Sequence, residues 1–106
     1  HRAILNVVGN ALDAVEGRDT PQVHIELQRR ADDQVAINIR DNGTGIATDD
    51  IRKIFSVFES RKGNRGTGLG LPVSQKILRE HRGDIDVESQ LDVGTTFTLH
   101  WPIKGP

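Results

Sequence analysis

The sequence predicts a single α/β (α+β) domain, a two-layer sandwich in which helices cover one mainly antiparallel sheet. Its 106 residues are enough for one hydrophobic core but not for two. Segments with a helical period alternate along the chain with segments in which every second residue is apolar. The resulting order is helix, hairpin, short helix, loop, helix, hairpin, which is typical of helices layered on a sheet.

The composition excludes several classes of function. Hydrophobic residues make up 35% and charged residues 27%, as in an ordinary soluble domain, and the net charge of −1 gives no basic excess for nucleic acid or anionic membranes. The absence of cysteine excludes disulfides and thiolate metal sites. No apolar run approaches the roughly 18 residues that span a bilayer. We therefore expect a cytoplasmic domain, even if its parent protein is membrane-bound. Because residue 1 falls inside a predicted helix, residues 1–106 are expected to be a fragment of that longer protein.

The first predicted helix covers residues 1–16. Its apolar stripe consists of Ile4, Val8, Ala11 and Val15, joined by Leu5 and Leu12. Asn6 and Asn10 lie one turn apart on the opposite face. They are interpreted either as a solvated polar face or as amide oxygens that hold a hard cation such as Mg²⁺.

A carboxylate and two glycines follow the second strand of the first predicted hairpin. Residues 23–28 and 35–40 alternate in polarity and predict two half-buried strands, each with one face toward the core. The sequence Asp41-Asn42-Gly43-Thr44-Gly45 comes next. The aspartate can accept a hydrogen bond from an exocyclic amine such as that of adenine, and the glycines let a flat ligand lie against the main chain. The same letters are also a common turn sequence, so this stretch alone does not decide between the two interpretations.

A glycine-bearing loop separates the two later helices. Thr48 with two following aspartates predicts a short helix, and residues 59–66 show no period and are expected to be mobile without ligand. Gly66-Thr67-Gly68-Leu69-Gly70-Leu71 then leads into a helix over about 69–81, an arrangement that favours a phosphate. The spacing fits neither a Rossmann fingerprint nor a Walker A loop. Lys62 and Arg65 either close over phosphates or are simply solvated.

The last segment predicts a second hairpin. Gly83 ends the preceding helix, and strands follow at residues 85–87 and 97–101, with a turn at 90–94.

Together these segments resemble the ATP-binding domain of two-component sensor histidine kinases, in the GHKL superfamily. The resemblance covers nearly the whole chain, in the family's order and spacing. The motifs are an N box at Asn6-Val7-Val8-Gly9-Asn10-Ala11, a G1 box at Asp41-Asn42-Gly43-Thr44-Gly45-Ile46, an F box at Phe55-Ser56-Val57-Phe58, a G2 box at Gly66-Thr67-Gly68-Leu69-Gly70-Leu71, and a glycine-threonine element at Gly94-Thr95-Thr96-Phe97.

The resemblance implies the Bergerat fold, a mixed sheet of about five strands covered by helices on one face, with ATP and Mg²⁺ as cofactors. This chain supplies four strands, so an edge strand is expected upstream. Asn10, helped by Asn6, would hold the metal, and Asp41 would accept the adenine amino group. The other implied nucleotide-binding residues are Ala14, Gly43, Gly45, Ile46, Lys62 in the ATP lid, Gly66, Thr67, Gly68, Leu69, Gly70, Leu71 and Thr95.

Three positions depart from the family pattern. Val57 replaces a frequent proline and Glu59 a frequent aromatic residue, so lid closure is expected to differ. Asp13 stands where many sensor kinases carry lysine or arginine. The short lid and the N-A-x-x-A helix are more similar to the nitrogen-regulation type.

The resemblance implies transfer of the γ-phosphoryl to a histidine on a separate dimerisation domain, and indirectly to a response regulator receiver domain. An ATPase of the gyrase, mismatch-repair or heat-shock chaperone kind is the alternative, but such relatives carry a glutamate base where this chain has Asn6, which cannot take a proton from water. A serine kinase of the anti-sigma type, or a nucleotide sensor without catalysis, is the third possibility. Two histidines lie in predicted strands, one at a helix end and one at residue 1, so the phosphoacceptor is expected outside this chain.

Overall fold

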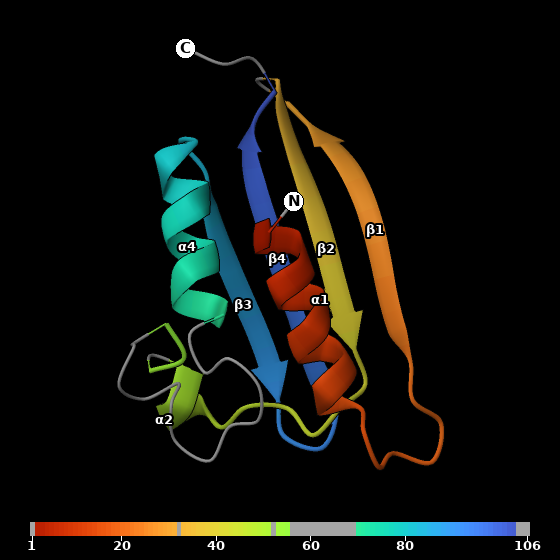
Figure 1. The fold of residues 1–106 in the computed structure, drawn as a ribbon. Coiled ribbons are helices and arrows are strands. Elements are labelled where there is room, and N and C mark those ends of the chain that lie inside the picture. Colours follow the sequence, from red (N-terminus) through yellow and green to blue (C-terminus); the bar gives the residue numbers. More distant parts are fainter. Residues whose placement is uncertain (1, 32, 52, 56–69, 104–106) are drawn as a thin grey trace.

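The computed structural model describes residues 2–31, 33–51, 53–55 and 70–103 and shows a two-layer α/β sandwich (Figure 1). In chain order the elements are α1 (Arg2–Ala14), β1 (Val23–Arg30), β2 (Gln34–Asp41), α2 (Thr48–Ile51), α4 (Gly70–Glu80), β3 (Asp84–Gln90) and β4 (Gly94–Pro102). The predicted fold class is confirmed, and so is the order of the described helices and strands, while the loop predicted at residues 59–66 lies outside the described residues. In the part of the chain that the structure describes, no helix is long and apolar enough to cross a membrane.

The four strands form one sheet in the order β1-β2-β4-β3. β2 and β4, one strand from each hairpin, pair at its centre. The register places Ile39 opposite Ile25 on one side and opposite Phe97 on the other, so the apolar residues share one face. All three pairings are antiparallel, so the four described strands do not include the parallel pairing of a mixed sheet.

Helices α1 and α4 lie side by side on that apolar face, α1 over the centre of the sheet and α4 over β3 (Figure 1). The predicted apolar stripe of α1 was wrong in part, because the fully buried positions are Ala3, Val7 and Ala11. Leu5 and Leu12 are 69% and 57% exposed. The three buried positions follow one another at intervals of four residues and therefore lie on one side of the helix, whereas Leu5 and Leu12 lie outside this buried side.

Strand β1 was predicted to be half-buried, and this was also wrong. Ile25 and Leu27 are 57% and 70% exposed. β1 is an edge strand on the side of the sheet away from α4, and Figure 1 shows that neither helix lies over it. The alternation of β1 therefore predicted the strand correctly, but the burial of its apolar side chains depends on where the helices pack.

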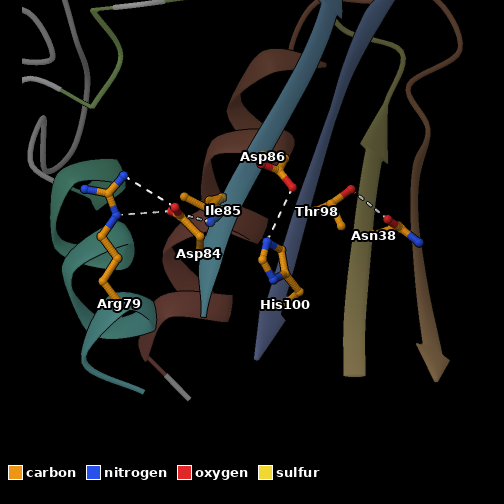
Figure 2. A network of polar contacts seen from close by, with 7 residues as sticks. All are labelled: Asn38, Arg79, Asp84, Ile85, Asp86, Thr98 and His100. Atoms are coloured by element: carbon orange, nitrogen blue, oxygen red, sulfur yellow. Dashed lines mark hydrogen bonds and ion pairs between the residues drawn. The ribbon is translucent and has the colours of Figure 1, made fainter. Parts of the chain in front are cut away.

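The second face of the sheet is polar and carries side-chain contacts across the strands (Figure 2). The Thr98 hydroxyl donates to Asn38 Oδ1 at 2.7 Å, and His100 Nε2 lies 3.4 Å from Asp86 Oδ2. Thr98 and Asn38 are directly opposed in the register and His100 and Asp86 are diagonal neighbours, and polar pairs of both kinds support strand pairing. Because its side chains are polar, this face can remain in contact with solvent without a second layer of helices.

The end of α4 differs from the prediction in its detail. The residue with positive φ is Arg82, at 65°, and the N–H of Gly83 donates to Leu78 O at 2.7 Å. A Cβ on Gly83 would collide with the carbonyl oxygen of His100. Glycine is therefore required here for close packing against β4, while the arginine supplies the left-handed turn.

Candidate functional site

The predicted adenine-binding carboxylate lies at the end of β2, where the strand leaves the sheet. Asp41 is 5% exposed, and its Oδ1 accepts a hydrogen bond from the N–H of Gly43 at 2.8 Å. Burial raises the pKa of Asp41 above its ordinary value, although hydrogen bonds from the backbone N–H groups of Gly43 and Thr95 act in the opposite direction. A buried carboxylate held from the main chain is preorganised to accept a further hydrogen bond.

The loop after Asp41 passes so close to α1 that glycine is required. A Cβ on Gly43 would collide with the carbonyl oxygen of Ala14, and the N–H of Thr44 donates to that same oxygen at 3.3 Å. Gly45 has φ 78°, and a Cβ there would collide with the carbonyl oxygen of Gln90. The structure therefore brings together Ala14, Asp41 and both glycines, as the sequence predicted.

A serine that the sequence analysis missed connects this loop to the β3–β4 hairpin. Ser89 Oγ accepts from the N–H of Ile46 at 2.7 Å, donates to Gly94 O at 3.1 Å and lies 2.7 Å from Thr95 Oγ1. A hydroxyl has one proton and two lone pairs, so with its proton on Gly94 the bond to Thr95 must come from the threonine. Ser89 thus fixes two of the predicted site residues, Ile46 and Thr95.

An arginine from the segment after α1 was also missed. Arg18 Nε donates to Asn42 O, and Arg18 Nη2 donates to Gly43 O and to Asp92 O, each at 2.8 Å. The Asn42 side chain in turn accepts from the N–H of Gln22 at 2.8 Å. No local pattern marks these contacts, because each joins segments that are far apart in the sequence.

The two predicted metal ligands lie on α1. Asn6 and Asn10 are half-buried and one turn apart, so both amides project from the same side of the helix. In the described ranges, His, Cys, Asp and Glu form no group of three that could hold a metal. The chemistry of the asparagine donors, neutral oxygens only, fits a hard cation that keeps several waters, and the magnesium site stays a prediction.

The predicted phosphate-binding residues are mostly not covered by the structure. Lys62, Gly66, Thr67, Gly68 and Leu69 lie outside the described residues. Gly70 begins α4, and the half-buried Leu71 packs against the core. The start of α4 thus agrees with the helix predicted after the glycine loop.

A hollow of about 440 Å³ lies at the same end of the sheet. His24, Arg40, Glu88 and Thr96 line it, and the strand register puts these four on the polar face, opposite to the helices. The hollow also reaches the candidate site itself, because its lining includes Asp41, Ser89, Gly94 and Thr95.

Comparisons with known proteins agree with this geometry. The family model described as histidine kinase-, DNA gyrase B-, and HSP90-like ATPase matches residues 1–105. The signal transduction histidine-protein kinase AtoS of Escherichia coli (strain K12) is 43% identical over 103 residues, which are 97% of this chain but only 16% of AtoS.

Two solved structures share the fold. Full-length ShkA, crystallised in complex with AMPPNP, has a TM-score of 0.84 at 26% identity, over 99% of this chain and 21% of ShkA. The catalytic domain of histidine kinase ThkA has a TM-score of 0.80 at 29% identity, over 95% of this chain and 64% of that one. Because the family model spans nearly all of its residues, this chain belongs to the histidine kinase-, DNA gyrase B- and HSP90-like ATPases, as an ATP-binding domain of the sensor histidine kinase type.

Proposed function

We propose that this domain binds Mg·ATP and presents the γ-phosphoryl to a histidine on a dimerisation domain of its parent protein. The observation that carries the proposal is Asp41, a carboxylate that is 5% exposed and oriented by the Gly43 N–H at the end of a central strand. Such a carboxylate suits the amino group of adenine and would repel the oxygen of guanine. Gly45 and Thr95 would support the base beside it.

On this proposal the phosphate end of the nucleotide lies toward α1 and α4. Asn10, helped by Asn6, would hold Mg²⁺, which when bound neutralises phosphate charge. Gly66 to Leu71 would wrap the phosphates and Lys62 would belong to the lid. What supports these assignments is the match of the motifs, together with the positions of Asn6, Asn10 and the start of α4.

The reaction class follows from the residue type at position 6. Phosphoryl transfer depends mainly on positioning and charge neutralisation, so bound ATP is stable until a nucleophile arrives in line. Asn6 has no basic group to activate water. The phosphoryl would therefore go to a histidine outside this domain, and from there to the receiver domain of a response regulator.

The test is to titrate the domain with ATP and Mg²⁺ by calorimetry and then follow hydrolysis. We expect binding with very slow hydrolysis, and formation of a phosphoprotein once the parent's helical domain is added. A phosphohistidine is lost in acid and survives alkali. Fast hydrolysis by residues 1–106 alone would identify an ATPase, and a product stable in acid would identify a serine kinase instead.

A further inference from the structure

The guanidinium of Arg18 is placed at a point where three backbone carbonyl groups converge. It donates at 2.8 Å to the oxygens of Asn42, Gly43 and Asp92. The first two belong to the loop after Asp41 and the third to the β3–β4 turn. Carbonyl dipoles that point at a common centre repel one another, and a planar cation with several N–H donors offsets that repulsion.

One of these carbonyl groups belongs to a peptide that also contacts Asp41. The peptide between Asn42 and Gly43 accepts from Arg18 Nε through its oxygen and donates to Asp41 Oδ1 through its N–H, both at 2.8 Å. A positive charge on the oxygen side polarises a peptide and strengthens its N–H as a donor. The two hydrogen bonds therefore form one chain from the arginine to the carboxylate.

Arg18 also helps to join the loop after Asp41 to the β3–β4 turn. Asp92 has φ 64°, and its N–H donates to Thr44 O at 2.8 Å, so the β3–β4 turn and the Asp41 loop are joined directly as well as through Arg18. Arg18 is half-buried, whereas Arg29 on β1 forms an ion pair with Asp33 at 3.7 Å and has a 74% exposed side chain. The contacts of Arg18 are thus built into the fold.

We propose that Arg18 is a positioning residue for base recognition, which acts through the Asn42–Gly43 peptide to keep the Asp41 carboxylate oriented toward the adenine amino group. This inference rests on the proposed function, because it assumes that Asp41 accepts that amino group. On this proposal Arg18, which lies outside the motifs, contributes to the selectivity for adenine.

The experiment compares two ligands that differ only in the amino group. Affinities for Mg·ATP and for the magnesium complex of purine riboside 5′-triphosphate, which lacks the 6-amino group, are measured for the wild type and for Arg18→Met. We expect the variant to lose about 3- to 10-fold in affinity for ATP, through partial loss of a charge-assisted hydrogen bond, and less than about twofold for the analogue. Arg29→Met is the matched control and should change neither affinity.

Several outcomes decide the inference. An equal loss of affinity for both ligands would show that Arg18 only maintains the fold. No loss for either ligand would show that Arg18 is not needed for binding. Either result overturns the proposal. In the Asp41→Ala background, Arg18→Met should have almost no further effect on ATP, and full additivity would also overturn it. If Arg18→Met does not fold, Arg18→Lys, which lacks the planar fork, is judged by the same ratio of affinities. Failure of the wild type to bind ATP would instead contradict the proposed function.

Discussion

The hydroxyl oxygens of Ser89 and Thr95 lie 2.7 Å apart and join the end of β3 to the start of β4 beside Asp41. Ser89→Ala would leave the N–H of Ile46 without its acceptor and Thr95 without its partner. We expect the free energy of unfolding to fall by about 1–3 kcal/mol. Chemical denaturation measures it. Thr96→Val is the control, because Thr96 makes no hydrogen bond through its side chain to the described residues; an equal loss there would contradict the role of Ser89.

Asp41→Ala should weaken ATP binding strongly. A charge-assisted hydrogen bond contributes about 1.5–3 kcal/mol, which corresponds to a loss of roughly 10- to 150-fold in affinity. Calorimetric titration of the variant checks this, with a thermal melt to show that the fold is intact. A folded variant with unchanged affinity would remove Asp41 from the nucleotide site.

The affinity for ATP should also depend on pH through Asp41. Burial raises the pKa of this carboxyl, so protons compete with the adenine amino group at a higher pH than for an exposed aspartate. As the pH falls through that raised pKa, the affinity of the wild type should decline relative to that of Asp41→Ala. The ratio of the wild-type affinity to the Asp41→Ala affinity is used because protonation of ATP itself affects both proteins equally. A ratio that stays constant between about pH 7 and pH 4 would contradict the assignment of Asp41.

Two glycine substitutions should act in opposite directions. Gly43→Ala would drive a methyl group into the carbonyl oxygen of Ala14, so the loop must move, and both stability and ATP affinity should fall. Gly9 lies within α1, and a Cβ there would meet none of the described residues within 4 Å beyond its own chain neighbours and helix backbone. Gly9→Ala should therefore stabilise the domain by about 0.5–1 kcal/mol through helix propensity. Thermal unfolding of the two variants tests the pair, and a Gly43→Ala variant as stable as the wild type would show that the close contact is dispensable.

Arg79→Met tests a contact at the edge of the sheet. Arg79 Nε lies 3.3 Å from Asp84 Oδ1 (Figure 2). Burial alone would raise the pKa of Asp84, but the N–H of Ile85 and the side chain of Arg79 outweigh it and lower the pKa. A lowered folded-state pKa contributes stability above the unfolded value, which is lost as the pH falls through the folded one.

The variant should consequently lose about 0.2–1 kcal/mol of stability at pH 7. That difference should disappear at a pH below the lowered pKa of Asp84. Arg29→Met, which removes the more exposed pair with Asp33, should change stability less. A loss that persists in acid would point to packing of the Arg79 stem rather than to its charge.

Periodicity predicted the two long helices and the four strands, because each carries its own apolar pattern, whereas the short helix α2 was predicted from Thr48 and the two aspartates that follow it. It did not predict which residues are covered, since Leu5 and Leu27 satisfy the pattern and still face solvent. That outcome depends on the placement of α1 and α4 over the sheet, which is a property of the whole fold.

The motifs predicted Asp41, Gly43, Gly45 and Thr95 at one end of the sheet. They could not predict Arg18 or Ser89, because arginine in a turn and serine in a strand have many ordinary roles. Their importance comes from acceptors and donors in distant segments, which only the structure brings within hydrogen-bonding distance.

The central pairing of β2 with β4 makes the proposed nucleotide site a product of both halves of the chain. Asp41 is the last residue of β2 and Thr95 the second residue of β4, and they face each other only when the two hairpins have joined. Neither half alone carries the complete site, so we expect a ligand of this site to bind the folded state. Nucleotide at a hundred times its dissociation constant would then raise the free energy of global unfolding by about 2.7 kcal/mol. The level of nucleotide in the cell would set how often this domain opens completely, and hence how long it survives proteolysis.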